Sequence, residues 1–269
     1  MTTQVERMPA DGSLYYREHM ARYEFAMRQA RPGVTLDIAT GTGYGAAYVA
    51  QYLGTPCIGV DVDHSAIAGA RLTYSSHNLT YIVADGCNLP FADQYFENIV
   101  TLETLEHIAD ANRFLSELRR TLKPDGVVVL STPNKLYSVA HKITNPFHVC
   151  EYTEADLLTL LRGFFKQVDL FYQGFAPTYQ ARVREHKQNV ANGRDSLPLP
   201  VKLAIRHVYR PIRRWIPRSM TNYAIKNTLN LTYPQPEPLE IVVSDEPIED
   251  FNVFVTVCRQ PLGEADKHA

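Results

Sequence analysis

Glu103, Glu106 and His107 form a short cluster of side chains whose types can carry chemistry. They follow an apolar run that predicts a strand. If a helix begins at Thr104, they fall on roughly one face of it, because residues three and four apart are neighbours on a helix. Two carboxylates and an imidazole grouped in this way can bind a divalent cation or hold a general base. A second histidine, His148, comes later, just before another predicted helix.

Three aspartates lie in or at the end of apolar runs that predict strands: Asp37, Asp61 and Asp85. A carboxylate at Asp37 suits a ligand with an ammonium group. Asp61 can accept hydrogen bonds from two ribose hydroxyls, and Asp85 can accept one from an adenine amino group. An ammonium, a ribose and an adenine together describe S-adenosylmethionine.

The loop Gly41-Thr-Gly43-Tyr-Gly45 lies between a predicted strand and a predicted helix at 46–52. Glycines let the backbone approach a ligand closely, and the helix N-terminus offers unpaired N–H groups. The G-x-G-x-G spacing argues against a dinucleotide site, whose fingerprint is G-x-G-x-x-G. The candidate cofactor-binding residues are Asp37, Gly41, Thr42, Gly43, Asp61, Val62, Asp85, Gly86 and Glu103.

Five segments in this order and spacing resemble class I S-adenosylmethionine-dependent methyltransferases. The resemblance covers roughly the first half of the chain and implies a methyltransferase with a Rossmann-like sheet. The segments are LDIATGTGYG (36–45), GVDVD (59–63), VADGCNLPF (83–91), FENIVTLETLEHI (96–108) and LKPDGVVVLSTPN (122–134).

Two groups within that superfamily look similar around the histidines, namely small-RNA 2′-O-methyltransferases and ubiquinone-pathway O-methyltransferases. The RNA group holds a metal with an E-x-x-E-H string and a histidine in an H-x-x-E-W-T string. Carried over, this resemblance implies Glu103, Glu106, His107 and His148 as metal ligands (Mg or Mn), with His107 and His148 catalytic. Tyr152 replaces the tryptophan of the string. In metal-free relatives with the same E-x-x-E-H string, the first glutamate lies near the cofactor and the histidine packs locally.

The segment 15–30 predicts an N-terminal helix with an apolar stripe. It resembles the lid helix of bacterial methyltransferases associated with glycan assembly. The resemblance implies that Arg22 approaches either the methionine carboxylate or the acceptor. The alternative is a solvated arginine.

The composition favours a globular protein. The chain has 269 residues, 45% of them hydrophobic, and a formal net charge of −2. The four cysteines show no C-x-x-C spacing, and we identify no secretory signal and no apolar run long enough to span a membrane. We expect a soluble, cytoplasmic protein, peripheral at the inner membrane face if it contacts a membrane at all.

The predicted fold class is α/β, with a doubly wound, mostly parallel, seven-stranded sheet. Its last strand, at 252–258, is antiparallel. A turn at Pro124–Gly126 separates a helix from the following strand. We divide the chain into a lid-helix segment (1–32), a methyltransferase core (33–173), an insertion (174–250), and a last strand with a tail (251–269).

The insertion is basic. Residues 182–218 contain ten Lys/Arg against two Asp/Glu, a net charge of +8, interleaved with apolar residues and the single tryptophan, Trp215. Three interpretations remain open: a surface helix packed on the core with solvated arginines, an amphipathic element on a membrane surface, or a site for polyanions.

The leading functional hypothesis is an O-methyltransferase whose acceptor is a hydroxyl of a sugar or of a lipid-linked glycan intermediate. The alternatives are a quinone-precursor or natural-product O-methyltransferase, an RNA 2′-O-methyltransferase, and a non-catalytic, cofactor-binding partner subunit. We expect peripheral membrane contact through 182–218 and do not expect nucleic acid as a partner.

Overall fold

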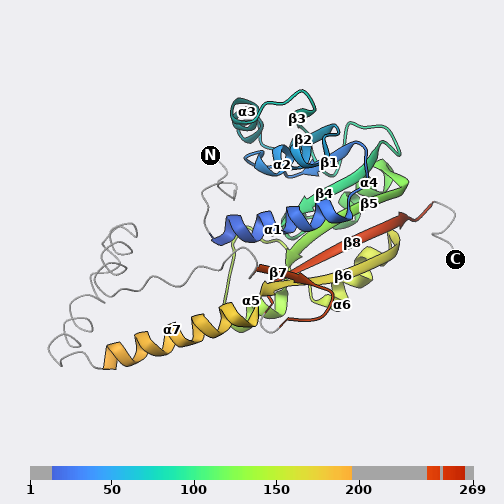
Figure 1. Ribbon diagram of the computed structural model, residues 1–269. Helices are drawn as coiled ribbons and strands as arrows, with labels where there is room; N and C mark the ends of the chain where they lie inside the picture. The colour runs from blue at the N-terminus through green and yellow to red at the C-terminus, as the bar shows by residue number, and fades with distance from the viewer. Residues whose placement is uncertain (1–13, 196–240, 249–250, 264–269) are drawn as a thin grey trace. The chain divides into compact units, whose positions relative to one another are not determined.

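An eight-stranded sheet forms the centre of the computed structural model, which describes residues 14–195, 241–248 and 251–263 (Figure 1). Its strands are β1 (Thr35–Ile38), β2 (Cys57–Asp61), β3 (Leu79–Val83), β4 (Phe96–Leu102), β5 (Leu122–Pro133), β6 (Phe165–Phe175), β7 (Ile241–Ser244) and β8 (Val253–Pro261). They lie in the order β3-β2-β1-β4-β5-β8-β6-β7. The first five in this order pair in parallel, whereas β8 is antiparallel to both β5 and β6.

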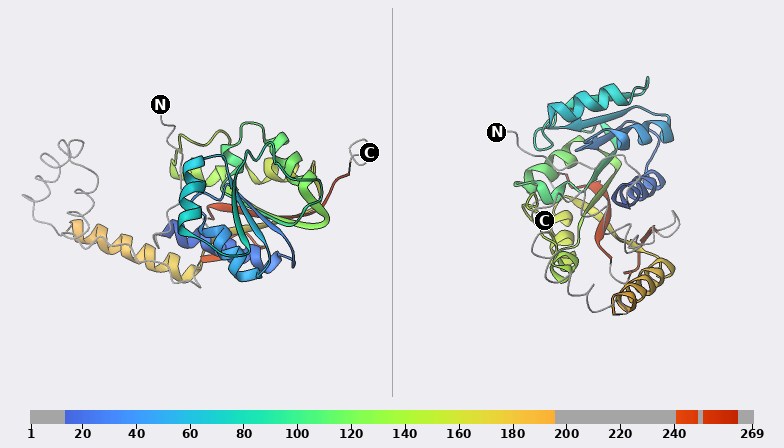
Figure 2. Two further views of the ribbon diagram at one scale, coloured as in Figure 1. Left: turned by 90° about the horizontal axis from the view of Figure 1, so that it is seen from above. Right: turned by 90° about the vertical axis from the view of Figure 1, so that its left-hand side faces the viewer.

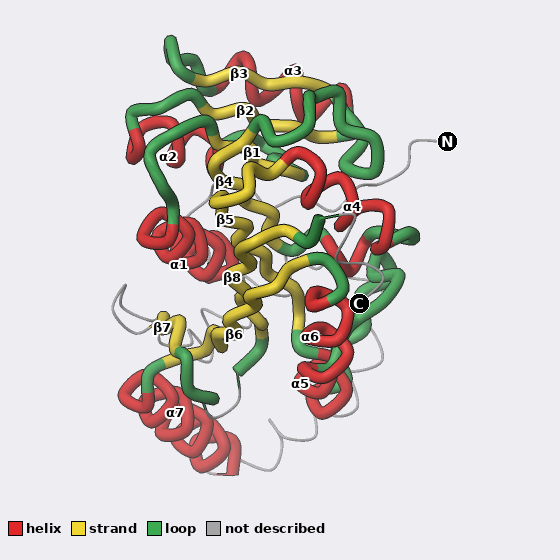
Figure 3. Tube along the Cα trace, turned by 90° about the vertical axis from the view of Figure 1, so that its right-hand side faces the viewer, coloured by secondary structure: helices red, strands yellow, loops and turns green. Residues whose placement is uncertain are grey.

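Helices cover both faces of this sheet. The elements are α1 (Leu14–Gln29), α2 (Tyr44–Leu53), α3 (His64–Thr73), α4 (Ala111–Thr121), α5 (Lys135–His141), α6 (Glu154–Arg162), α7 (Pro177–Asp195) and the 3₁₀ turn η1 (Leu105–His107). Figure 3 shows α1 and α2 on one side of the sheet and α4, α5 and α6 on the other. Both views of Figure 2 show α1 and α4 on opposite sides of the strands.

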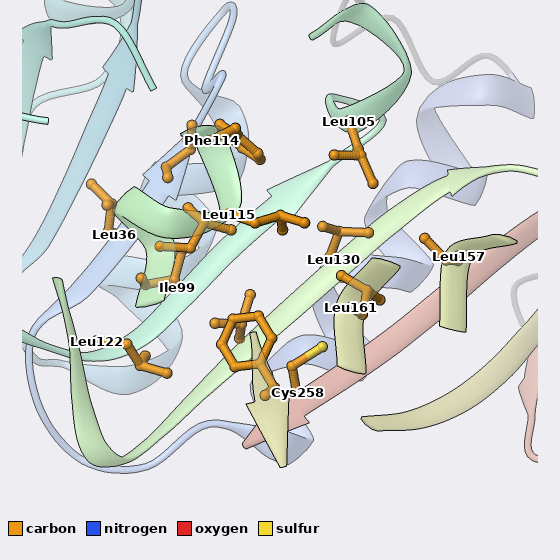
Figure 4. Close-up of a cluster of buried hydrophobic side chains, with 14 of the residues drawn as sticks. Leu36, Ile99, Leu105, Phe114, Leu115, Leu122, Leu130, Leu157, Leu161 and Cys258 are labelled. Carbon is orange, nitrogen blue, oxygen red and sulfur yellow. The ribbon is translucent and has the colours of Figure 1, made fainter. Parts of the chain in front are cut away.

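Each face of the sheet has its own hydrophobic core. One core packs α4 and α6 on the sheet through fully buried side chains such as Phe114, Leu118 and Leu161 (Figure 4). The other packs α1, α2 and α3 through small and aromatic residues such as Ala46 and Ala70. This doubly covered parallel sheet confirms the predicted α/β class, because parallel strands need burial on both faces.

Local sequence explains where several helices begin. Asp110 caps α4 by accepting from the backbone N–H of Arg113, and Thr153 caps α6 in a capping box with Asp156. Such caps satisfy N–H groups that have no partner within the helix. Thr153 belongs to the residue types that favour the N-cap position.

Three sequence predictions need correction. The sheet has eight strands and not seven, because β7 lies at its edge beside β6. Pro124–Gly126 is not a turn between helix and strand. It belongs to β5, where the register with β4 shifts between Phe96 and Asn98. No helix begins at Thr104, since Glu103 has a φ of +52° and only the single turn η1 follows.

The chain divides into two compact units. Unit 1 comprises residues 1–174 and 241–269, and unit 2 comprises 175–240. The described part of unit 2 is mainly α7, so most of the predicted basic insertion, including Trp215, lies outside the described residues. Searched across the described residues, no helix combines the length and apolar character that a membrane span requires.

Candidate functional site

The glycine loop follows β1 and leads into α2 at the carboxyl edge of the sheet. Gly41 and Gly43 adopt φ values of +54° and +87°, in the left-handed region that side chains disfavour. A Cβ at Gly43 would lie 2.6 Å from the Cβ of Ala70, so α2 and α3 can approach only because this residue is glycine. A Cβ at Gly41 would meet only the Ala39 carbonyl, at 3.9 Å, and would otherwise point into open space. The loop therefore presents open backbone on its outer side.

Asp37 lies beneath this loop and is fully buried. Its two carboxylate oxygens accept from the Tyr23 hydroxyl at 2.9 Å and from the Thr40 hydroxyl at 2.5 Å. Burial raises the pKa of Asp37 to about 6, while those two hydrogen bonds oppose the rise. In this structure the carboxylate ties the loop to α1, and the predicted contact with an ammonium group stays a prediction.

Asp61 and Asp85 stand at the ends of the next two strands. Asp61 is half-buried and accepts from the backbone N–H groups of Gly41 and Asp63, both at 2.9 Å. Asp85 is exposed and accepts from the N–H of Cys87. Because β1, β2 and β3 are parallel neighbours, these acids share one edge with the glycine loop.

The other candidate cofactor-binding residues near these acids and in the glycine loop differ in exposure and packing. Val62 is 67% exposed beside Asp61. Gly86 packs closely, since a Cβ there would lie 2.8 Å from the Phe114 ring. Thr42 lies between the two glycines of positive φ.

Glu103 is directed toward β5. Its carboxylate accepts from the Ser131 hydroxyl at 2.7 Å, and its backbone N–H donates to the Ser131 carbonyl at 3.0 Å. The positive φ at Glu103 turns the chain away from a helical path. Glu103 therefore leaves the face that it was predicted to share with Glu106 and His107.

Glu106 and His107 form the centre of a polar cluster. Glu106 is 1% exposed; one oxygen accepts from the Thr132 hydroxyl at 2.9 Å, and the other, Oε1, has no hydrogen-bond partner among the described residues. Burial, and then the nearby Glu103 carboxylate, raise the pKa of Glu106 well above its usual range. His107 Nδ1 lies 3.0 Å from the Phe147 carbonyl, which can only accept, so Nδ1 carries the proton. The basic nitrogen of His107 is then Nε2, 3.9 Å from Glu106 Oε1.

His148 completes this cluster. Its Nδ1 lies 2.6 Å from Glu151 Oε1, and its Nε2 lies 2.9 Å from the Asn145 amide nitrogen. The Asn145 oxygen accepts from the Phe147 N–H, which fixes the orientation of that amide. Nδ1 of His148 therefore donates to Glu151, and Nε2 accepts from Asn145.

The structure brings three of the four predicted metal ligands together. One ligand atom each from Glu106, His107 and His148 lies within 4.8 Å of the others, and the two imidazole rings are 5.0 Å apart. Glu103 is absent from that group because Ser131 holds it. Among the described residues, the donor set for a metal is thus one carboxylate and two imidazoles.

Helix α1 adds a buried polar face. Arg22 is 3% exposed and donates through Nη1 to the Gln173 side chain, while its Nε has no partner among the described residues. Gln173 also donates to the Glu18 carbonyl, and Asn252 donates to the Glu18 carboxylate at 2.8 Å. Arg22 is therefore a buried cation held by a neutral amide, which excludes the solvated alternative.

His19 lies one residue from this network and is not a proton acceptor at neutral pH. Its Nδ1 is 2.5 Å from the Tyr44 hydroxyl. Burial, and then the positive charge of Arg22, lower the pKa of the His19 imidazole to about 3. The histidines of the polar cluster at this edge are His107 and His148.

Sequence reasoning did not identify Glu151, Asn145 or Gln173. Glu151 and Asn145 lie three residues either side of His148, and that symmetrical spacing of polar residues was an available signal. Gln173 lies in a strand and reaches α1 across 151 positions of sequence, so no local pattern could indicate it.

Comparison with known proteins identifies a family that part of the chain matches. Residues 36–130 match a methyltransferase domain family. A probable S-adenosylmethionine-dependent methyltransferase of Mycolicibacterium smegmatis is 30% identical over 154 residues, which cover 56% of this chain and 59% of that protein. The chain thus spans little more than half the length of this curated relative.

Solved structures agree on the fold. A putative methyltransferase of Bacillus halodurans superposes with a TM-score of 0.53 at 16% identity, covering 90% of this chain and 98% of that one. Phosphoethanolamine N-methyltransferase 2 of Haemonchus contortus, solved with S-adenosyl-L-methionine, superposes with a TM-score of 0.51 at 16% identity. The match covers 90% of this chain and 53% of that one.

Proposed function

We propose that this chain, whose residues 36–130 match a methyltransferase domain family, is an S-adenosylmethionine-dependent methyltransferase that transfers a methyl group to a hydroxyl of a sugar or lipid-linked glycan. The observation that carries the choice of a hydroxyl is the Glu106–His107–His148 cluster. A hydroxyl must lose its proton when it is methylated, whereas a neutral amine already offers a lone pair. A base at the same carboxyl edge of the sheet as the glycine loop therefore favours oxygen acceptors.

The residues present fit S-adenosylmethionine. Gly41 leaves open space in front of its backbone, and carboxylates end both β2 and β3. When bound, the cofactor supplies a sulfonium methyl: the acceptor oxygen bonds to that carbon as the S–CH₃ bond breaks, and the electron pair stays on sulfur. The chain has to position the acceptor in line and take up its proton.

His107 is the proposed proton acceptor. The Phe147 carbonyl fixes its tautomer, so Nε2 is free to take the proton. The imidazolium formed would stand 3.9 Å from Glu106 Oε1, the oxygen that has no hydrogen-bond partner among the described residues. His148, oriented by Glu151, is the second histidine of the same edge.

A divalent metal fits the same cluster. Glu106 Oε1 is a buried acceptor without a partner in the described part of the chain, His107 Nε2 is the unprotonated nitrogen of its ring, and His148 Nε2 becomes available if Asn145 turns away. A bound Mg²⁺ or Mn²⁺ would supply Lewis acidity that lowers the pKa of the acceptor hydroxyl. Titration with Co²⁺ tests this part: a visible absorption band should form, persist in His141→Ala, and disappear in His148→Ala.

Arg22 is a candidate for binding either a polar acceptor or the methionine carboxylate at the carboxyl edge of the sheet. Its unpartnered Nε can donate to an anionic or hydroxyl oxygen. Peripheral membrane contact through 182–218 remains part of the proposal on the basis of charge alone.

The experiment is a measurement of S-adenosylhomocysteine release with four acceptor classes: glycans, lipid-linked glycans, quinone precursors and RNA. We expect turnover with a glycan class, and His107→Ala should lower kcat by about 10²–10⁴-fold with unchanged cofactor affinity. His141→Ala is the matched control, because that exposed histidine also bonds a carbonyl through Nδ1. Turnover only with quinone precursors or only with RNA would make that class the acceptor in place of a glycan. Cofactor binding without any turnover would favour a non-catalytic partner subunit.

A further inference from the structure

Each ring nitrogen of His148 already has a partner. Nδ1 lies 2.6 Å from Glu151 Oε1, and Nε2 lies 2.9 Å from the side-chain nitrogen of Asn145. An ionised carboxylate only accepts hydrogen bonds and an amide NH₂ group only donates them, so the lone pair of the His148 ring lies on Nε2. The Asn145 amide therefore occupies the lone pair that this neutral imidazole would give to a metal ion.

The backbone on both sides of His148 is tied to η1. The N–H of Val149 donates to the Glu106 carbonyl at 2.7 Å, and the Phe147 carbonyl lies 3.0 Å from Nδ1 of His107. The two imidazole rings meet edge to face, with their centroids 5.0 Å apart. The place of the second imidazole beside the first is thus set by backbone contacts and not by one neighbouring side chain alone.

His107 and His148 share an arrangement that metal-binding histidines commonly have. Each donates its Nδ1–H to a fixed oxygen, a backbone carbonyl for one and the Glu151 carboxylate for the other, which leaves Nε2 as the basic nitrogen. Such outer partners set the tautomer and the ring orientation of histidines that bind metals. The third donor atom, Glu106 Oε1, is buried and has no hydrogen-bond partner among the described residues.

The Asn145 amide is turned toward His148 by its own backbone neighbour. Its oxygen accepts from the Phe147 N–H at 3.0 Å, so its NH₂ group faces the ring. A hydrogen bond between two neutral groups contributes little net free energy compared with a metal–imidazole bond. An ion can therefore displace the amide, and the displaced hydrogen bond lowers the affinity for that ion.

We propose that Asn145 limits metal binding at the Glu106–His107–His148 cluster: its amide occupies His148 Nε2 until a divalent transition-metal ion displaces it, and Glu151 orients the ring for that ion. Two of the three donors are imidazole nitrogens, so the site should bind Co²⁺ or Zn²⁺ more tightly than Mg²⁺, which prefers oxygen ligands, with Mn²⁺ between them. This deepens the proposed function and rests on its metal-assisted form.

The test is a titration of the chelator-treated protein with Co²⁺, measured by calorimetry and by the visible absorption band. Asn145→Ser should bind Co²⁺ about three- to tenfold more tightly than wild type. A serine hydroxyl can still accept from the Phe147 N–H but is too short to reach His148. Asn145→Ala should shift the affinity in the same direction. Glu151→Ala should bind about 10–100-fold more weakly, because the ring loses the partner that orients it.

Asn112→Ser and Glu154→Ala are the matched controls. Both residues are exposed on other elements, α4 and α6, and their replacement should leave the Co²⁺ affinity unchanged. Opposite shifts from the two neighbours of one imidazole separate the proposed roles from a general loss of structure, which would weaken binding in both variants. In competition, Zn²⁺ should displace Co²⁺, and Mg²⁺ at the same concentration should not.

Four results would overturn the proposal: no Co²⁺ binding by the wild type, unchanged or weaker binding by both Asn145 variants, unchanged or tighter binding by Glu151→Ala, or equal displacement of Co²⁺ by Mg²⁺. Release of S-adenosylhomocysteine with glycan acceptors separates this proposal from the proposed function. Turnover by a protein that binds no Co²⁺ contradicts only the roles of Asn145 and Glu151. The expected Co²⁺ shifts without turnover on any acceptor contradict the proposed function.

Discussion

At the scale of single residues, the acids of the site divide into those that hold the protein together and those that can still reach a ligand. Asp37 has both oxygens engaged by hydroxyl groups, whereas Asp61 is half-buried and engages two backbone N–H groups. A carboxylate oxygen can accept more than one hydrogen bond, so a ribose hydroxyl can share Asp61 with these N–H groups.

Replacing Asp61 should therefore weaken cofactor binding. We expect Asp61→Ala to raise the free energy of S-adenosylhomocysteine binding by about 1–3 kcal/mol, because hydroxyls lose a charged acceptor and Gly41 loses the bond that positions the loop. Calorimetric titration measures this, with Asp63→Ala as the control for the neighbouring helix cap. An unchanged dissociation constant for Asp61→Ala would remove the residue from the site.

The pKa of Asp37 predicts a pH dependence of stability. The pKa is about 6 in the folded protein against an ordinary 3.8, so the folded state keeps a proton that the unfolded chain releases. The stability that the retained proton of Asp37 contributes to the folded state is present below about pH 4 and is lost as the pH rises through 6. From pH 4 to 7, wild type should lose about 2 kcal/mol of unfolding free energy relative to Asp37→Asn. Denaturant titrations at several pH values check this, and a difference independent of pH would contradict it.

At the scale of elements, close backbone packing holds the lid helix in place. A Cβ on Gly45 would lie 2.0 Å from the Tyr23 ring, so α1 rests directly on α2. The same tyrosine reaches Asp37 under the glycine loop. The position of α1 and the shape of the cofactor loop are thus linked through one aromatic ring.

We expect Gly45→Ala to destabilise the fold by about 1–3 kcal/mol by overpacking and to weaken S-adenosylhomocysteine binding. Gly69→Ala on α3 is the matched control, because a Cβ there meets nothing within 4 Å and should add about 0.5–1 kcal/mol of stability. Thermal denaturation and calorimetry measure both effects. Equal behaviour of the two variants would mean that α1 does not rest on Gly45.

Sequence reasoning found these elements where local pattern determines structure. The strand–glycine–helix unit follows from hydrophobic periodicity and the spacing of the glycines. The helix at Thr104 was wrong because a distant partner, Ser131, holds Glu103 in a left-handed conformation. Asp37 also accepts a hydrogen bond from Tyr23, which lies on a different element, α1. A contact between separate elements cannot be predicted from the local sequence around either residue.

At the scale of the whole molecule, unit 2 interrupts a sheet that is otherwise complete. Its residues, 175–240, lie in sequence between β6 and β7, which are neighbours in the sheet of unit 1. A sheet whose two flanking strands are already adjacent needs only a short connection between them.

Replacing residues 177–239 by a short Gly-Ser linker should therefore leave unit 1 folded, with S-adenosylhomocysteine affinity within about threefold of wild type, since the candidate cofactor-binding residues all lie in unit 1. Circular dichroism and calorimetry measure the two properties. Aggregation or complete loss of cofactor binding would mean that unit 2 is required for the fold of unit 1.

The central position of β8 has a consequence for synthesis. β5 and β6 do not pair with each other; each pairs with β8, which comes last in the sequence. On the ribosome, β5 emerges more than a hundred residues before its partner, which at typical rates is on the order of ten seconds. During that interval one edge of β5 has no strand to pair with, and unpaired edges invite association with other chains. The nascent protein thus depends on protection, by chaperones or by its own helices, until β8 emerges.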